Sequence, residues 1–537
     1  MTENTPADWV LYGGRIHTFD QDDRTVSAVA LAGGRVLATG TDEQVRRYED
    51  ARTRRTDLAG RTVLPGFCDT HMHLIEVAQQ DQQVVAPTAR TAADLAAAIA
   101  AHTGSVAPGQ WIQARSSISA PAAAEQATSQ LPDRDLLDQV APDHPVFVYR
   151  RPDRAALNSR GITALGAALD ALAPDEWDPR TGLLSGPKVR VVREWVMQQF
   201  TFDEAAALDT IRRTGAEFAA MGITTVVDAG QAAGFENAWN FFRTASRTGA
   251  FPQRLRVMHH LDQRATFASQ LALIESCPVP PDSGDEKLHG FGLKMIIDGE
   301  FGDAWMRAGE ELDIPQRRWY TVEQIRQVVQ LCSDRGWNLT IHVMGGGSAD
   351  AAIDIVREIR DRDGNLRPGQ ITFAHGFLLD HRAMLACRDL QITVSCHPTL
   401  AHMFAAELHR AWGPLAGRAI PIATMIDLGV RVSGGSDATP CHPLFGAANA
   451  VTRIGADGRS FGANEAVTPY QAIDLFTRRA GDYVSEPRIG TLSPGSFADL
   501  TVWEDDPLDL PVDTWARLTA ALTVVDGAVV HGDPEQF

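Results

Sequence analysis

The chain has 537 residues, of which 49 are basic and 68 acidic, so its formal net charge is −19. This length exceeds a single ordinary core, which stops growing at roughly 250–300 residues, so we expect one large domain with smaller additions. The acidic balance argues against nucleic acid or an anionic membrane surface as a partner, because both require a basic face. An apolar content of 44% with 22% charged residues is typical of a soluble globular protein.

Targeting signals and cysteine pairs are not evident in the sequence. No run approaches the ~18 apolar residues that a membrane helix needs, and the first residues lack the pattern of a signal peptide. The six cysteines are spread singly, which favours reduced thiols over a disulfide framework or a thiolate zinc site. We therefore expect a cytoplasmic protein that acts on a small molecule, and the sequence leaves homo-oligomer formation open.

Short strands separated by glycine turns characterise both ends of the chain. Over residues 8–65, Gly13-Gly14 and Gly33-Gly34 are expected to form hairpin turns. The last segment has the same texture, with strands predicted at 499–503 and 522–530. Because neither half could bury its apolar face alone, we predict that residues 1–65 and 485–537 form one composite β-sandwich domain.

The central segment alternates helices with short β-branched strands. Capping boxes at 201–204, 321–324 and 468–471 predict helix starts, and the helices are expected to end near Gly222, Gly336 and Gly481. Near-continuous apolar strands separated by helices are typical of a parallel sheet buried on both faces. We predict a (β/α)8 barrel of the TIM type over residues 66–484, with strands at 62–64, 223–227, 255–258, 291–297, 339–343, 371–373, 391–394 and 430–432.

Residues 75–190 do not follow this rhythm. They contain an alanine-rich helix at 92–101, a stretch rich in proline and aspartate, and an apolar strand at 146–149. We interpret the segment as an insertion after the first barrel strand that covers the barrel mouth.

Chemically active side chains gather at the predicted strand ends. Barrel enzymes place their active sites at the carboxyl ends of the strands, where this chain has four histidines, one lysine and one aspartate. The His-x-His pair can reach one metal if the strand bends, and imidazole with carboxylate suits zinc or a similar divalent ion. The predicted metal ligands are His71, His73, Lys294, His342, His375 and Asp437.

Lys294 supports the metal hypothesis. Only three of the 49 basic residues are lysines, so a lysine inside an apolar strand requires a specific reason. A buried amine can lose its proton and react, which a guanidinium cannot do. With carbon dioxide it would form a carbamate, an anionic ligand able to bridge two metals.

The combined motifs resemble the amidohydrolase superfamily, in the branch that includes N-substituted formamide deformylases. They are Leu64-Pro-Gly-Phe-Cys-Asp-Thr-His-Met-His73, Lys294 with Asp298-Gly299, the two later strand-end histidines, Gly435-Ser-Asp437 with Pro443, and Gly495-Ser-Phe-Ala-Asp499. The resemblance implies a metal-dependent barrel with a terminal sandwich. It also implies that His71, His73 and Asp437 bind one metal, that His342 and His375 bind a second, and that carbamylated Lys294 bridges them.

Two positions depart from the pattern of this branch, and both concern the substrate pocket. Gly346 stands in a run of three glycines where the branch has Gly-Asp, and Arg154 stands where it has a histidine before Asn158-Ser. A guanidinium suits a carboxylate, so Arg154 suggests an acidic substrate, with a pair between Arg154 and Asp153 or another nearby acid as the alternative. His397 and His442 are further candidate substrate contacts, with local hydrogen bonding as the alternative.

These observations predict a hydrolase that cleaves a non-peptide C–N bond (amide, N-formyl or cyclic amide) by a metal-bound hydroxide. Asp437 would move the proton as general base and then general acid. A deaminase or a lactone or ester hydrolase is the alternative within enzymes, because a fold does not fix the chemistry. A catalytically silent binding protein is the alternative outside them, and the intact set of six residues speaks against it.

Overall fold

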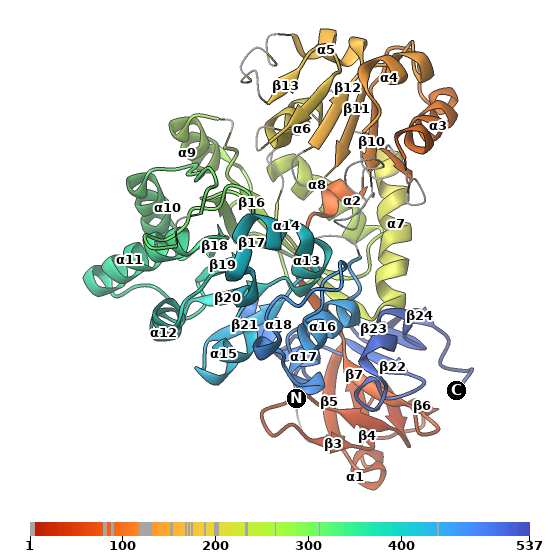
Figure 1. Cartoon of the computed structure of the whole chain (residues 1–537). Coiled ribbons are helices and arrows are strands. Elements are labelled where there is room, and N and C mark those ends of the chain that lie inside the picture. Colours follow the sequence, from red (N-terminus) through yellow and green to blue (C-terminus); the bar gives the residue numbers. More distant parts are fainter. Residues whose placement is uncertain are drawn as a thin grey trace. The chain divides into compact units, whose positions relative to one another are not determined.

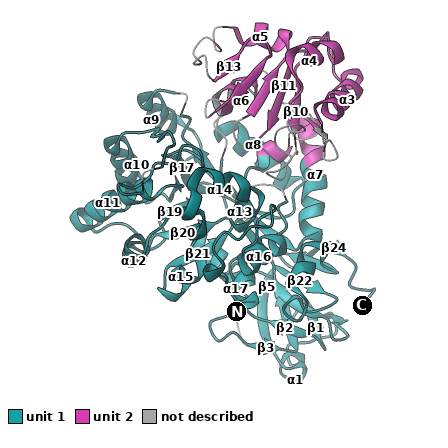
Figure 2. Ribbon diagram, in the orientation of Figure 1, with its two compact units in different colours: residues 1–74, 211–537 teal, residues 75–210 magenta. Residues whose placement is uncertain are grey.

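The computed structural model describes residues 6–78, 83–86, 91–116, 131–150, 154–166, 169, 172, 176–186, 189–197, 203–230, 235–263, 265–310, 312–437 and 440–537. The chain divides into two compact units, residues 1–74 with 211–537 and residues 75–210 (Figure 2). All six cysteines are free thiols. Among the described helices, none combines the length and apolar character that crossing a bilayer would require.

Eight parallel strands form the central sheet of the first unit, each paired with the next in chain order. They are β8 (Phe67–Met72), β15 (Ile223–Asp228), β16 (Arg254–His260), β17 (Leu288–Ile296), β18 (Leu339–Val343), β19 (Ile371–His375), β20 (Thr393–Cys396) and β21 (Arg431–Gly434). Consecutive parallel strands linked by helices are the arrangement of a TIM-type barrel, so the predicted fold class is confirmed (Figure 1).

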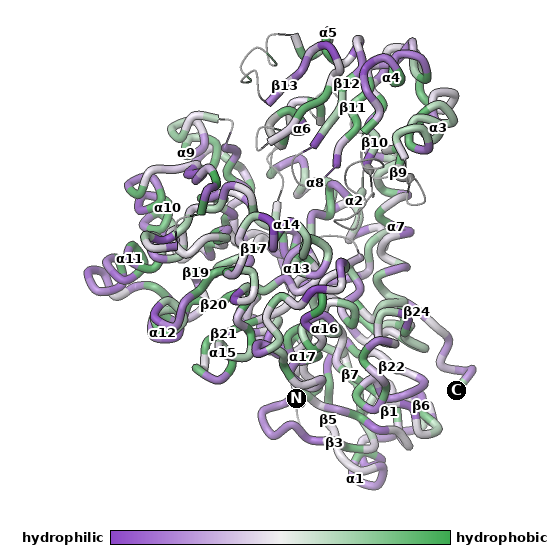
Figure 3. The backbone as a smooth tube through the Cα atoms, in the orientation of Figure 1, coloured by the Kyte–Doolittle hydropathy of each residue, from purple (hydrophilic) through white to green (hydrophobic). Residues whose placement is uncertain are grey.

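Amphipathic helices surround this sheet. They include α8 (Phe235–Arg247), α9 (Phe267–Ser276), α10 (Val322–Arg335), α11 (Gly346–Asp363), α12 (His381–Leu390), α15 (Ile422–Asp427) and α16 (Pro443–Thr452). Helices α10 and α11 carry both hydrophilic and hydrophobic residues, as an element with one buried face requires (Figure 3). The large core of the first unit contains residues from both the strands and these helices.

The first and last barrel strands, β8 and β21, meet at a seam, where each donates a backbone hydrogen bond to a carbonyl that lies in neither strand. The backbone amide of Cys68 donates to the carbonyl of Phe476, and that of Gly434 donates to the carbonyl of Leu475, both at 2.8 Å. These two carbonyls lie between α17 (Pro469–Asp474) and α18 (Arg478–Tyr483). Nearer the carboxyl ends of the two strands, the hydroxyl of Thr70 in β8 donates directly to the carbonyl of Gly434 in β21 at 2.9 Å.

The first barrel strand differs from the prediction. Residues 62–64 belong to β7 (Thr62–Pro65), which pairs with β2 (Arg15–His17) and β22 (Leu500–Trp503) outside the barrel. The barrel strand β8 begins at Phe67 instead. Gly66 makes the crossing possible, because a Cβ there would lie 2.3 Å from the Cγ2 methyl of Thr224. Two apolar runs separated by Pro-Gly are therefore strands of different sheets.

The two ends of the chain combine into two facing sheets. One has the order β5-β4-β1-β6 and the other the order β24-β23-β22-β7-β2-β3. Apolar residues from both sheets form one core, which is the expected sandwich. Its further strands are β1 (Trp9–Tyr12), β3 (Thr25–Val26), β4 (Ala28–Ala32), β5 (Arg35–Gly40), β6 (Arg54–Asp57), β23 (Leu522–Val525) and β24 (Ala528–Gly532), and α1 (Asp42–Arg46) follows β5.

The two glycine pairs in this domain behave differently. Gly33-Gly34 joins the antiparallel strands β4 and β5, as predicted. The prediction of a hairpin at Gly13-Gly14 is wrong, because β1 and β2 lie in different sheets. A Cβ at Gly14 would lie 2.4 Å from the side chain of Leu58, so the glycine permits a tight corner between the sheets.

Helix termini follow their sequence signals closely. Thr321 closes a capping box at the start of α10, and Gly336 ends it in a left-handed conformation with φ of 67°. Thr468 forms the same box at α17. That helix ends at Asp474, before the predicted end near Gly481, and α18 follows it. Part of the predicted box at 201–204 lies outside the described residues, although α7 (Glu204–Ala220) is present.

The second unit has its own six-stranded sheet with the order β13-β14-β12-β11-β10-β9. Its strands are β9 (Gln83–Ala86), β10 (Ile112–Ser116), β11 (Val146–Arg150), β12 (Arg154–Leu157), β13 (Trp177–Asp178) and β14 (Leu183–Ser185). Its helices include α3 (Ala92–His102), the predicted alanine-rich helix, α4 (Arg134–Val140), α5 (Ser159–Leu165) and α6 (Val189–Met197). Two separate apolar clusters stabilise this unit.

Candidate metal centre

The six predicted ligands stand at one end of the parallel sheet. His71 lies in β8 and His73 directly follows it, Lys294, His342 and His375 lie in β17, β18 and β19, and Asp437 follows β21. Parallel strands end at the same edge, so residues far apart in sequence meet there. His73 has 27% of its side chain exposed, and the other five are buried.

The first group of candidate ligands surrounds the Asp437 carboxylate. Its Oδ1 atom lies 3.4 Å from Nε2 of His71 and 3.3 Å from Nε2 of His73. Candidate ligand atoms of these three residues all lie within 4.8 Å of one another. The Nζ atom of Lys294 is 3.5 Å from Nε2 of His71. The predicted first metal set therefore converges around one carboxylate.

A second group shares the same carboxylate. His375 and His397 together with Asp437 also offer ligand atoms within 4.8 Å of one another. The ring of His342 lies 4.4 Å from that of His375, measured between centroids. His397 is completely buried, and its Nδ1 atom faces Nδ1 of His375 at 2.7 Å. The substrate contact suggested for His397 stays a prediction.

The hydrogen bonds of His342 determine which of its ring nitrogens has a lone pair. Nε2 lies 3.0 Å from the carbonyl oxygen of Gly299, which can only accept, so Nε2 carries the proton. In the neutral ring Nδ1 then has the lone pair. Asp298, with Oδ1 at 3.6 Å from the same Nε2, also favours this tautomer. Such outer contacts are the usual means of orienting a metal-binding imidazole.

Two site residues adopt a left-handed backbone. The φ angles of His375 and Asp437 are 76° and 54°, a region that residues with a Cβ seldom occupy. The amide of Asp437 donates to the carbonyl of His71 at 2.8 Å, which fixes the strained turn against β8. Gly435 is needed nearby, because its Cβ would lie 3.0 Å from that of His71. Strain of this kind is concentrated at functional sites.

Burial sets the ionisation states of the cluster. It lowers the pKa of His71 and of His375 far below the ordinary value, and the pKa of His397 to about 3. Burial opposes ionisation of Asp437, but the hydrogen bond from His73 and the neighbouring imidazoles outweigh it, so the pKa of that carboxyl lies well below its usual range. At neutral pH His71, His375 and His397 are thus neutral and lie beside an ionised carboxylate.

These residues fit a divalent metal ion. Neutral imidazole nitrogens and a carboxylate are the donors that zinc and similar ions take. The Nδ1 atom of His71 is buried and has no hydrogen-bond partner in the described part of the chain. A buried polar atom without a partner is costly, so the cluster is built for a further group.

Carboxylates that support the cluster were not recognised as functional in the sequence. Asp69 accepts hydrogen bonds from the amides of His71 and Ser436, each at 3.0 Å, and burial raises its pKa to about 6. Burial also raises the pKa of Asp298 to about 7. The position of Asp69 two residues before His71, within the strand-end motif, is the signal that could have identified it.

Two more strand-end residues were missed. Asp228 ends β15 and accepts a hydrogen bond from the amide of Leu74 at 2.7 Å. His260 ends β16 beside Lys294 in the register of the sheet. The predicted strand at 255–258 stopped two residues short of His260, so its place at the strand end was not evident.

The remaining candidate substrate contacts lie as follows. His442 caps α16 by accepting from the amide of Leu444, and its Nε2 atom is 2.8 Å from the carbonyl of Leu518. These hydrogen bonds correspond to the local hydrogen bonding that was the alternative to a substrate contact for His442. Arg154 begins β12 in the second unit and is exposed, and Asp153 lies outside the described residues. Substrate roles for both stay predictions.

The three glycines after β18 are explained by close packing. A Cβ at Gly345 would lie 2.0 Å from the carbonyl oxygen of Trp305, and one at Gly347 would lie 2.4 Å from that of Met306. At Gly346 it would lie 2.7 Å from the carboxylate of Glu310. The departure at Gly346 thus allows α11 to begin close to the segment that follows β17.

Comparisons with known proteins agree with this architecture. The chain is 26% identical to the N-substituted formamide deformylase of Arthrobacter pascens over 97% of its own length and 98% of that protein. An uncharacterised metal-dependent hydrolase from Pyrococcus horikoshii OT3 superposes with a TM-score of 0.74 at 19% identity, covering 94% of this chain and 99% of the other. The zinc complex of the atrazine chlorohydrolase TrzN from Arthrobacter aurescens TC1 gives 0.52 at 14% identity, with 98% and 96% covered.

The parallel strands and the residues at their carboxyl ends define a (β/α)8 barrel that carries a candidate metal centre. Residues 55–531, most of the chain, match the amidohydrolase family. The chain belongs to the amidohydrolase family, as the resemblance of its motifs predicted.

Proposed function

We propose that the chain is a metal-dependent hydrolase that cleaves a non-peptide C–N bond, in an amide, an N-formyl group or a cyclic amide. The observation that supports it most is the convergence of neutral imidazoles on the ionised Asp437 at the carboxyl end of the barrel. The Arthrobacter relative named as an N-substituted formamide deformylase supports this bond class, because it matches nearly the whole chain.

The residues divide between holding metal and moving protons. His71, His73 and Asp437 would hold one ion, and His342 and His375 a second. Divalent ions bound there would lower the pKa of a water molecule and polarise the substrate carbonyl. Asp437 is ionised, so it can accept the proton of the attacking water and return it to the leaving nitrogen.

Lys294 completes the proposed centre as a carbamate. Its amine is buried and lies 3.5 Å from Nε2 of His71, so an anionic bridging group there would neutralise charge from the ions. Carbon dioxide adds to the neutral amine, the new N–C bond forms, and one amine proton leaves to solvent.

Metal content and a carbon-13 signal test this centre. The parent protein should hold about two divalent ions per chain, as two-metal hydrolytic sites do, and should show a carbamate resonance after growth with ¹³C-bicarbonate. Lys294→Arg should lose the resonance and at least one ion while remaining folded. Lys287→Arg changes the only other described lysine and should retain both signals. One tightly bound ion in all three proteins would contradict the two-metal centre and favour a deaminase-like site.

The type of bond that the protein cleaves has to be tested with substrates. Metal-replete protein should hydrolyse members of a panel of N-formyl amines, N-acyl amines and cyclic amides. Turnover confined to lactones or esters, or to deamination, would overturn the C–N assignment while leaving the metal centre intact. A protein that binds metal and hydrolyses none of these classes would point to the silent binding protein.

A further inference from the structure

A chain of four buried side chains leads away from the proposed metal centre. It begins at His375 and continues through His397 and Ser395 to Thr70, and it ends at the backbone carbonyl of Gly434. All four side chains are at most 3% exposed. The chain connects β19, β20, β8 and β21, which are the strands on both sides of the barrel seam.

The contacts along this chain are continuous. Nδ1 of His375 lies 2.7 Å from Nδ1 of His397, and Nε2 of His397 lies 3.2 Å from the hydroxyl of Ser395. That hydroxyl is 2.7 Å from the hydroxyl of Thr70, which donates to the carbonyl of Gly434 at 2.9 Å. Each contact between titratable or hydroxyl groups needs one proton and one lone pair.

The carbonyl of Gly434 at the end of the chain determines which partner donates in each hydrogen bond. Because a carbonyl oxygen can only accept, the single hydroxyl proton of Thr70 lies on that bond, and Thr70 must accept from Ser395. Ser395 then accepts from Nε2–H of His397. The Nδ1 atom of His397 has the lone pair of its neutral ring and accepts from Nδ1–H of His375. Nε2 of His375 is left with a lone pair.

The reverse direction has opposite consequences. If Thr70 donated to Ser395 and Ser395 to His397, then Nδ1–H of His397 would donate to His375. Nε2 of His375 would carry a proton and could not bind a metal, and the bond to the Gly434 carbonyl would be lost. Only the first direction both satisfies the carbonyl and prepares a ligand.

We propose that His397 is a positioning residue that fixes the tautomer of His375, so that Nε2 of His375 is held ready as a metal ligand. This inference rests on the proposed metal centre and adds to it a residue that acts through the ligand His375. His342 has the corresponding support from the carbonyl of Gly299. The two ligands of the second proposed ion therefore depend on different outer contacts, one on a side-chain relay and the other on the backbone.

Metal affinity of the metal-stripped protein, measured by competition with a chelator, tests the relay without requiring a substrate. Removal of an outer hydrogen bond to a ligating histidine typically weakens metal binding 10- to 100-fold, which we expect for His397→Leu. In His397→Asn the amide oxygen can occupy the place of Nδ1 and accept from His375, so most of the affinity should return. Ser395→Ala should weaken binding by about fivefold, the worth of one ordinary hydrogen bond.

Two control variants calibrate the measurement of metal affinity. His375→Gln sets the affinity without the ligand itself, and His402→Leu changes a histidine whose Nδ1 instead contacts the carbonyl of Ile454 at 2.7 Å. Equal affinity of His397→Leu and the parent would overturn the relay. The relay would also be overturned if His397→Asn lost as much metal affinity as His397→Leu while Ser395→Ala kept the affinity of the parent. That result would show that His397 is itself a metal ligand. If the parent binds no metal, the proposed function itself fails.

Thermal unfolding of the same variants separates tautomer control from a packing defect. A positioning role predicts lower metal affinity in Ser395→Ala at a nearly unchanged melting temperature without metal. The visible absorption of the cobalt-substituted protein should be retained in His397→Asn, because the set of metal ligands is unchanged. A cobalt spectrum altered in His397→Asn to the same extent as in His375→Gln would contradict the relay.

Discussion

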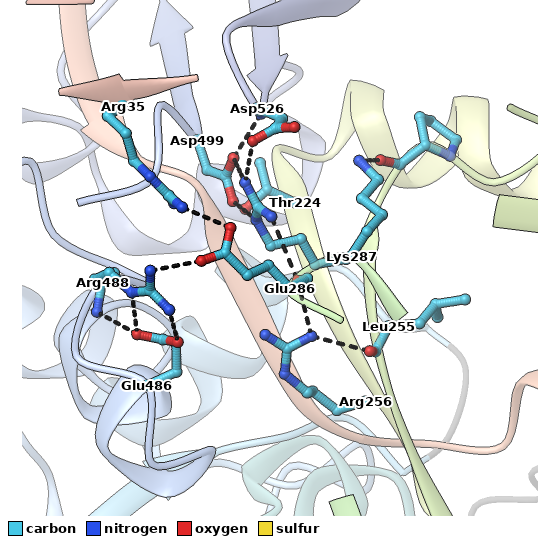
Figure 4. Close-up of polar contacts among 12 residues, drawn as sticks. Arg35, Thr224, Leu255, Arg256, Glu286, Lys287, Glu486, Arg488, Asp499 and Asp526 are labelled. Atoms are coloured by element: carbon cyan, nitrogen blue, oxygen red, sulfur yellow. Dashed lines mark hydrogen bonds and ion pairs between the residues drawn. The ribbon is translucent and has the colours of Figure 1, made fainter. Parts of the chain in front are cut away.

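The two ends of the barrel both bury ionisable side chains, but those at the amino end keep their charge and most of those at the carboxyl end are neutral. At the amino end, Arg254 is buried and forms a two-point ion pair with Asp499, with Nε–Oδ2 and Nη2–Oδ1 distances of 2.7 and 3.2 Å. Nearby, Arg488 and Arg35 both pair with Glu286 (Figure 4). At the carboxyl end, the buried groups are neutral imidazoles around one carboxylate.

The difference lies in whether a side chain can give up its proton. A guanidinium keeps its charge at all physiological pH values, so the buried Arg254 needs a permanent acidic partner. Its pair with Asp499 joins the barrel to the sandwich. Imidazoles become neutral when buried and then offer lone pairs. The two described lysines follow the same division, since the half-buried Lys287 donates to the carbonyl of Pro252 and the buried Lys294 lies beside His71.

The same comparison explains one of the motifs. Gly495 to Asp499 contributed to the resemblance to the amidohydrolase superfamily, and in the structure Asp499 accepts from Arg254 and from the amide of Asp526 at 2.7 Å. The amide of Gly495 donates to the carbonyl of Val36 at 2.8 Å. This motif therefore stabilises the junction of sandwich and barrel and contributes no ligand to the metal centre.

The largest effect is expected at the carboxyl end. Asp437→Asn keeps the size of the side chain but removes its basicity, so kcat should fall by roughly 10² to 10⁴, the usual contribution of general acid–base catalysis. Steady-state kinetics with metal analysis of the same sample would measure it. Asp505→Asn changes an exposed aspartate and should match the parent. Nearly unchanged turnover of Asp437→Asn with metals retained would show that another group moves the proton.

At the amino end, the main effect should be on stability. Arg254→Met leaves the buried Asp499 without its cation, which typically costs about 3–5 kcal/mol of unfolding free energy. Urea unfolding would measure the loss, and the metal content of the folded protein should not change. Arg357→Met breaks an exposed pair with Asp354 and should stay within about 0.5 kcal/mol of the parent.

The double variant Arg254→Met/Asp499→Leu sharpens this test. If the unpaired carboxylate causes the loss, removing it should restore much of the stability. A double variant as unstable as Arg254→Met would show that the stabilisation comes from other contacts of the arginine, such as its position 3.5 Å above the ring of Phe497.

A smaller, pH-dependent effect is expected from His259, which lies on β16 between the two ends. Burial lowers its pKa from 6.5 to about 4, and its ring stacks on Phe235. The unfolded chain binds this proton more readily, so the neutral histidine's contribution is present above pH 6.5 and is lost as the pH falls towards about 4. Between pH 7 and 5 the loss amounts to about 2 kcal/mol.

His259→Leu should remove that part of the pH dependence, as measured by urea unfolding at both pH values. His381→Gln, which changes an exposed histidine, should follow the parent. An identical pH dependence in His259→Leu and the parent would mean that other groups cause the acid sensitivity.

The sequence by itself determined the elements with strong local signals. Seven of the eight barrel strands were predicted because their β-branched runs alternate with capped helices, and the capping boxes at Thr321 and Thr468 fixed two helix starts. The strand-end histidines could be recognised because residues that follow parallel strands meet at one edge of the sheet. The combined sequence motifs also identified the resemblance to the amidohydrolase superfamily.

Only the tertiary structure decided which strands pair and what each polar group contacts. Residues 62–64 look like a barrel strand, but their partners β2 and β22 come from both ends of the chain, and pairing over such distances has no local signal. His397 appeared to be an isolated histidine near a strand end, because Thr70 and Ser395 are separated by 325 positions in the sequence. The direction of a proton along their contacts depends on a carbonyl that only the folded barrel brings into place.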